Sequence, residues 1–123
     1  MVDNIYDSLD RLKESFLYAA AQGGNTEDCV SLIEIGAEIN FKSPDGDTPL
    51  LAATRRGHTD TIEALVVYGA DVNIAGADSY APVHIAAQKG DMKIIDIFLS
   101  ANANITIRFD HAILKVILLL YPF

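Results

Sequence analysis

The chain of 123 residues contains a single cysteine, Cys29, and no tryptophan. One thiol excludes both a disulfide within the chain and a zinc site built from several cysteines. Aromatic residues make up only 8% of the sequence, so a hydrophobic core has to consist mainly of aliphatic and small side chains. The apolar share of 50% is close to the globular norm and is sufficient for one packed domain of this length.

Basic residues are also scarce. Nine Lys and Arg stand against 17 Asp and Glu, which gives a formal net charge of -8. Nucleic acids and anionic membrane surfaces are themselves negatively charged, and they repel a chain of this kind. We therefore expect neither a nucleic acid nor a membrane as the partner.

No targeting signal or long apolar run is visible. Residues 1–16 begin with no basic segment and contain no apolar run, and their four acidic residues argue against a mitochondrial presequence. The most apolar segment, residues 112–123, is interrupted by Lys115 and is shorter than the roughly 20 residues that span a bilayer. Together with the lone thiol, these features lead us to expect a cytoplasmic or nuclear protein.

Glycine recurs at a fixed interval along the chain. Gly24, Gly57 and Gly90 lie 33 residues apart, and the same offset relates several alanines, asparagines and prolines. An offset shared by so many structurally special residues predicts one supersecondary unit that is copied along the chain and stacked on its neighbours. Further residues in this register are Ala20, Ala53, Ala86, Asn40, Asn73, Pro49 and Pro82.

The middle copy begins with a turn and a short helix. Residues 43–47, Ser-Pro-Asp-Gly-Asp, have the composition of a tight turn in which Gly46 can adopt a positive φ. Thr48 suits the N-cap of a helix, and Pro49 suits its first position, where the missing N–H costs nothing. Gly57 is then the residue at which this helix ends.

A second helix is predicted over residues 59–68. Ile62, Leu65 and Val66 are spaced so that they lie on one face of it, and Gly69 follows as its end. The alanines of the unit allow two helices to approach closely. The predicted class is therefore all-α, built from paired helices.

These motifs, in register, resemble the ankyrin repeat. The fullest copy contains Asp45 to Ala53, Gly57-His58 and Leu65 to Asn73, and the resemblance covers residues 8–107. It implies an ankyrin-repeat solenoid of stacked helix-turn-helix units with β-turn or hairpin fingers. The predicted organisation is one domain over residues 1–123: an N-terminal capping repeat at about 8–42, repeats at 43–75 and 76–108, and an apolar C-terminal cap or tail at 109–123. Residues 1–15 are expected to form a capping helix with a polar outer face, and the helix of the first copy is expected to start at Phe16.

Two copies depart from the family pattern at the start of the first helix. The family pairs a Thr and a His within a Thr-Pro-Leu-His segment to fix the turn. Here Thr48 has Leu51 at the His position, and His84 has Ala81 at the Thr position. Each turn is therefore expected to be less rigid than the family pattern implies.

The C-terminal segment, Leu114–Phe123, is almost wholly apolar where a cap is expected to be polar outside. Three interpretations remain open. It packs as a closing helix against Ile94, Ile97 and Phe98, or it is the altered end of a longer array, or it docks onto a partner or a second copy, because exposed apolar patches often mark interaction sites.

No residue pattern points to catalysis, a metal or a cofactor. His58, His84 and His111 lie far apart in sequence and have no metal-binding spacing, so structural roles explain them sufficiently. Cys29 is in register with Ile62, which marks it as a core residue rather than a nucleophile. We therefore expect no enzyme activity, no metal and no cofactor.

The resemblance implies a non-catalytic protein–protein interaction module that holds a partner protein in its concave groove and on its turn tips. Tyr80 is the strongest single candidate, since tyrosine and arginine are enriched at binding hot spots. The pair Arg55-Arg56 with Lys89 forms a positive strip for a partner, or else simply complements a helix dipole. The residues carried over by register are Pro44, Asp45, Asp47, Arg55, Arg56, Ala77, Asp78, Tyr80, Gln88 and Lys89.

Two further functions fit the same resemblance. One is a regulatory inhibitor that occludes an enzyme or holds a transcription factor, which would change the activity of the captured partner. The other is an adaptor that recruits ubiquitin-ligase machinery through the C-terminal segment.

Overall fold

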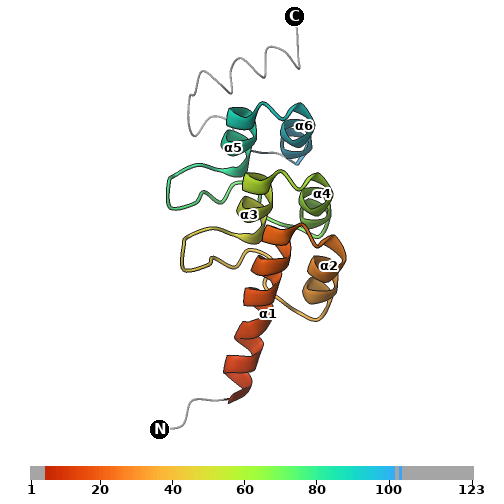
Figure 1. The fold of residues 1–123 in the computed structure, drawn as a ribbon, viewed down its shortest axis with the longest axis vertical. Coiled ribbons are helices and arrows are strands. Elements are labelled where there is room, and N and C mark those ends of the chain that lie inside the picture. Colours follow the sequence, from red (N-terminus) through yellow and green to blue (C-terminus); the bar gives the residue numbers. More distant parts are fainter. Residues whose placement is uncertain (1–4, 102, 104–123) are drawn as a thin grey trace, which may run out of the picture.

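The computed structural model describes residues 5–101 and residue 103, with side chains from Arg11 onward. These residues form three antiparallel helix pairs stacked along one axis, with α1, α3 and α5 in one row and α2, α4 and α6 in the other (Figure 1). No strand occurs among them, which confirms the predicted all-α class. The helices are α1 (Ile5–Gly23), α2 (Thr26–Glu34), α3 (Pro49–Arg56), α4 (Thr59–Val67), α5 (Pro82–Lys89) and α6 (Met92–Ser100).

The first helix is longer than its counterparts. The sequence predicts a capping helix over residues 1–15 and a separate helix start at Phe16, but α1 runs without a break through both and has 19 residues against eight in α3. No proline or glycine lies between Ile5 and Gln22 to interrupt it. The N-terminal part of α1 consequently projects beyond the end of the stack (Figure 1).

The core follows the repeat register. Cys29, Ile62 and Ile95 occupy equivalent positions in α2, α4 and α6, and all three are buried. Ala53 and Ala86 are likewise fully buried in α3 and α5, where a larger side chain would push the helices apart. The expectation that Cys29 is a core residue is confirmed.

Burial makes the Cys29 thiol a reporter of unfolding. Desolvation and the nearby Asp28 carboxylate raise its pKa to about 11, above its ordinary value of 9.0. We expect an aromatic disulfide reagent to label native Cys29 no faster than the chain unfolds, and denatured chain at once. Native labelling as fast as that of denatured protein would contradict this burial.

The raised pKa of Cys29 also makes stability depend on pH. The folded chain binds one proton more than the unfolded chain between pH 9 and about 11, so the free energy of unfolding should fall as pH rises through this range.

The two turn-to-helix junctions each keep one half of a reciprocal pair. Thr48 Oγ1 accepts the N–H of Leu51 at 3.2 Å at the start of α3. At the start of α5, His84 Nδ1 accepts the N–H of Ala81 at 3.0 Å. Each junction therefore holds one of the two side-chain bonds that a Thr–His pair would make.

Completing the pair in α5 should stabilise the chain. Ala81→Thr would add a hydroxyl that accepts the N–H of His84. A threonine fits such a site, because the equivalent Thr48 is only 2% exposed. The expected gain is about 1 kcal/mol in the free energy of unfolding, measured by urea denaturation. Thr48→Ala is the matched opposite and should lose a similar amount. An Ala81→Thr chain no more stable than the original would show that the existing His84 bond already holds the turn.

Two loops leave the stack on the same side as projecting fingers, residues 35–48 and 68–81 (Figure 1). In the first, the N–H of Gly46 donates to Ser43 O at 2.8 Å and the N–H of Ser43 donates to Asp47 O at 2.9 Å. The second repeats both bonds 33 residues later, between Ser79 and Gly76 at 3.0 Å and between Gly76 and Tyr80 at 3.1 Å. Both fingers are therefore the same hydrogen-bonded turn.

The C-terminal segment Leu114–Phe123 lies outside the described residues, so its three interpretations stay open. The predicted boundaries at residues 43, 76 and 109 also remain predictions. Over residues 5–101, none of the helices has both the length and the apolar character that a membrane span requires.

Candidate protein-binding surface

The ten predicted surface residues fall on two parts of the structure. Pro44, Asp45, Ala77 and Asp78 are exposed at the finger tips. Arg56, Gln88 and Lys89 are exposed at the C-terminal ends of α3 and α5. The other three, Asp47, Arg55 and Tyr80, are only partly exposed and contact other residues of the chain.

Arg55 joins the two fingers. Its Nε donates to Oδ2 of Asp47 at 2.8 Å, and its Nη2 donates to Oδ1 of the same carboxylate at 3.1 Å. Nη2 also donates to Oδ2 of Asp78, in the next finger, at 3.0 Å. One guanidinium from α3 thus holds a carboxylate from its own finger and another from the finger that follows.

Charge and burial make this cluster more than a solvated ion pair. The Asp47 side chain is 14% exposed, whereas those of Arg55 and Asp78 are 35% and 39% exposed. The hydrogen bond to Asp47 raises the pKa of Arg55 further above its ordinary value, so the guanidinium stays charged. Partial burial opposes ionisation of Asp78, but the Tyr80 N–H and the Arg55 guanidinium outweigh it and lower the pKa of Asp78.

Close backbone contact accompanies the ion pairs. A Cβ added at Gly76 would lie 2.7 Å from Oδ1 of Asp47 and 3.0 Å from Nη2 of Arg55, so only glycine leaves room for the guanidinium. Deeper in the fingers, the N–H of Asp71 donates to Oδ1 of Asn40 at 2.9 Å. The two fingers are therefore fixed side by side at both tip and base.

Tyr80 partly supports its own repeat. Its ring lies edge-on to that of His84, with centroids 6.3 Å apart and planes at 65°. His84 is fully buried, so this contact anchors the base of the second finger to α5. Tyr80 is therefore only partly exposed.

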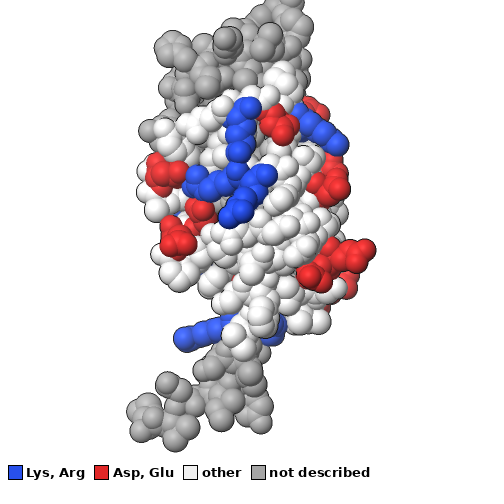
Figure 2. Space-filling model, in the orientation of Figure 1, with Lys and Arg blue, Asp and Glu red and all other residues white. Residues whose placement is uncertain are grey.

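Arg56 and Lys89 are the freely exposed cations of this surface. They occupy equivalent positions, 33 residues apart, in the last turns of α3 and α5. Figure 2 shows Lys and Arg side chains gathered on this face near the ends of these helices, with Asp and Glu side chains at its edges. In an acidic chain, this makes a local basic cluster.

The sequence matches the family model of ankyrin repeats, in three copies, over residues 16–109. The chain belongs to the ankyrin repeat family. A search of the curated proteins found no match to it. Ankyrin repeats generally mediate protein–protein interactions, and the family is generally non-catalytic.

The histidines of this ankyrin stack serve contacts between and within repeats. His58 Nε2 lies 3.0 Å from the carbonyl oxygen of Gln22, in the preceding repeat. Beside it, the hydroxyls of Thr26 and Thr61 are 2.8 Å apart and join α2 to α4. In the part of the chain that the structure describes, no three His, Cys, Asp or Glu side chains converge as metal ligands. His111 lies outside that part.

Reasoning from the ankyrin register located the exposed residues but missed how Arg55 is engaged. It assigned Arg55 either to a positive strip or to the helix dipole, whereas the structure shows the guanidinium already held by two carboxylates. One signal was available. Asp47 ends the first turn and Arg55 lies in the last turn of the following helix, so the pair is within reach across a single repeat.

Proposed function

We propose that this ankyrin stack is a non-catalytic module that holds a partner protein on the surface formed by the two finger tips and the C-terminal ends of α3 and α5. The observation that carries the proposal is the Arg55 cluster, which fixes the fingers relative to one another. A surface that is already ordered loses less conformational entropy on binding.

The partner is expected to present acidic side chains to this surface. Arg56 and Lys89 are exposed and adjacent in the stack, and the Asp47 and Asp78 carboxylates nearby are both paired with Arg55, which offsets one of their two charges. Electrostatic complementarity of this kind raises the association rate and selects against basic partners.

A charge-reversal experiment tests the proposal. The bait carrying both Arg56→Glu and Lys89→Glu should capture at least about tenfold less of the partner protein than the original bait, since two attractive contacts become repulsive. Lys93→Glu reverses one charge at an exposed position of α6, against two in the double variant, and as the control it should retain the captured protein. Proteins enriched on the original bait are quantified on all three by mass spectrometry. Equal retention on all baits would remove this surface from the proposal.

A further inference from the structure

No residue that the structure describes covers the N-terminal end of the stack. Pro49 and Ala52 of α3 are buried against the preceding helix pair. The equivalent residues of α1, 33 positions earlier, are Phe16 and Ala19, and both are exposed, Phe16 by 58%. The surface that two repeats use for stacking is therefore open in the first.

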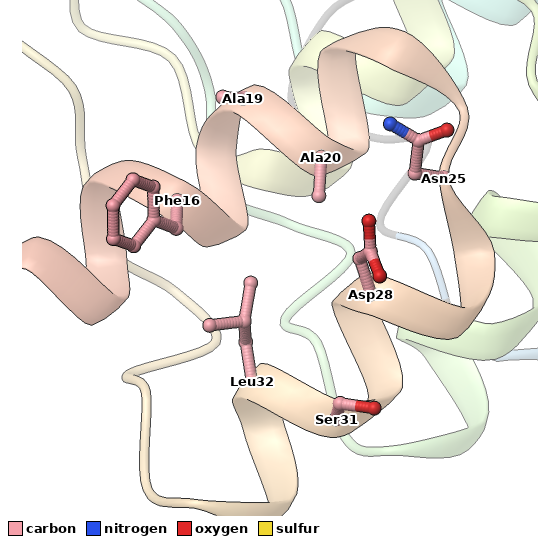
Figure 3. A pocket seen from close by; sticks show the side chains of 7 residues that line it. All are labelled: Phe16, Ala19, Ala20, Asn25, Asp28, Ser31 and Leu32. Carbon is pink, nitrogen blue, oxygen red and sulfur yellow. The ribbon is translucent and has the colours of Figure 1, made fainter.

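A hollow between α1 and α2 marks this open surface (Figure 3). Leu32 points from α2 toward α1, and Phe16 and Ala20 lie above it on α1. Asp28 and Asn25 form the polar end of the hollow. Its floor is apolar, as in the equivalent buried surface between repeats.

The exposed apolar residues continue along α1. Leu12 is 45% exposed, and it is followed by Phe16 and Ala19 at intervals of four and three residues. The same alternation of four and three extends back within the helix to Leu9 and Ile5. A spacing that alternates in this way over two heptads is the pattern of a helix that pairs with another helix.

A different face of α1 is used by the repeat stack itself. Leu17 and Ala21 are fully buried against the rest of the domain. At 100° per residue, these positions lie on the opposite side of the helix from the row formed by Leu12, Phe16 and Ala19. The α1 helix therefore has two apolar faces, and the described chain covers one of them.

The acidic residues of α1 do not oppose a like partner. In the heptad register, the three carboxylates of α1 (Asp7, Asp10 and Glu14) fall at positions remote from the row, and the flanking positions carry Tyr6, Ser8, Lys13, Ser15 and Ala20. No carboxylate of α1 therefore borders the row, although the chain as a whole carries a formal charge of -8. Two copies can bring their α1 helices together without placing acidic side chains against one another.

We propose that α1 pairs with α1 of a second copy of this chain, so that the row Leu12, Phe16 and Ala19 of each copy covers that of the other. The projecting part of each helix then extends over the hollow at Leu32 of its partner copy. Two copies related by a two-fold axis bury the same patch on both sides, which closes the assembly at a dimer. This interface lies at the end of the stack and does not depend on the finger surface.

Analytical ultracentrifugation of the full chain tests the proposal. The original chain should sediment with twice the monomer mass at high concentration and dissociate on dilution, because a two-heptad helix pair is short. Leu12→Glu and Phe16→Glu should each raise the dissociation constant at least about 100-fold, since each would bury a carboxylate without a partner. Circular dichroism should be unchanged, because both side chains are exposed in one copy.

Val67→Glu provides the matched control. Val67 lies on α4, is 80% exposed, and is equally an exposed apolar residue replaced by a carboxylate. This variant should keep the dissociation constant of the original chain. A monomer for the original chain over the whole concentration range would overturn the proposal. So would a dimer that survives both α1 substitutions, because it would have to use another surface.

Discussion

Replacing Gly24 by alanine is expected to lower the free energy of unfolding by about 3 kcal/mol. Gly24 has φ +72, which costs a residue with a side chain about 1–2 kcal/mol. Its added Cβ would also lie 2.7 Å from Nδ1 and 2.8 Å from Cγ of His58. That imidazole contacts the Gln22 carbonyl at 3.0 Å, so moving it forfeits a hydrogen bond worth about 1 kcal/mol.

Gly57→Ala separates backbone strain from the steric clash. Gly57 has the same φ of +72, and nothing lies within 4 Å of an added Cβ, so this variant should lose only about 1–2 kcal/mol. Urea denaturation of both variants measures the difference. Adding His58→Ala to Gly24→Ala should remove the clash, so the two losses should be less than additive. Equal losses for Gly24→Ala and Gly57→Ala would show that His58 gives way freely.

Arg55→Ala is expected to lower the free energy of unfolding by about 2 kcal/mol. Most of the loss comes from Asp47, whose largely buried carboxylate would lose two charge-assisted hydrogen bonds. The bond to the more exposed Asp78 adds little, because solvent screens it. Thermal or urea denaturation of Arg55→Ala checks the total.

Two controls identify the geometry of the cluster as the cause. Arg56→Ala removes the same kind of side chain one residue later, at an exposed position, and should change stability by no more than about 0.5 kcal/mol. Arg55→Lys keeps the charge without the two-pronged geometry, so it should recover only part of the loss. An Arg55→Ala chain as stable as Arg56→Ala would mean that the ion pairs contribute nothing.

Acid should slightly reduce the difference in the free energy of unfolding between Arg55→Ala and the original chain. The pKa of Asp78 is lowered from its ordinary 3.8 in the folded chain. Its contribution is therefore present above that value and is lost as pH falls through the lower, folded pKa. At neutral pH the Asp78 carboxylate is charged and its pair with Arg55 is intact.

The periodic parts of the structure were predictable from the sequence for a physical reason. A stack of identical units buries the same position in each copy, so the register of Cys29 with Ile62 was enough to place the thiol in the core. The helix ends at Gly57 and Gly90 follow from their left-handed conformation, which glycine adopts without strain. Local signals and the repeat agree at these positions.

The Arg55 cluster and the length of α1 were not predicted, for different reasons. The distance from Arg55 to Asp78 depends on how closely two fingers stack, which is a tertiary property that no local pattern contains. The continuity of α1 was visible as an uninterrupted stretch without proline or glycine, but the repeat register directed attention to a boundary at Phe16. Exposure of the apolar row on α1 became apparent only with the stack in place.

Hydrogen–deuterium exchange at the finger amides is the most direct measurement of whether Arg55 fixes the two fingers of the proposed binding surface relative to one another. In the original chain, the N–H groups of Gly76 and Ser79 donate to Tyr80 O and Gly76 O, so both should be protected. In Arg55→Ala they should exchange at least about tenfold faster, while amides within α4 keep their rates, because the opening is local. Unchanged exchange at Gly76 and Ser79 in Arg55→Ala would contradict the account.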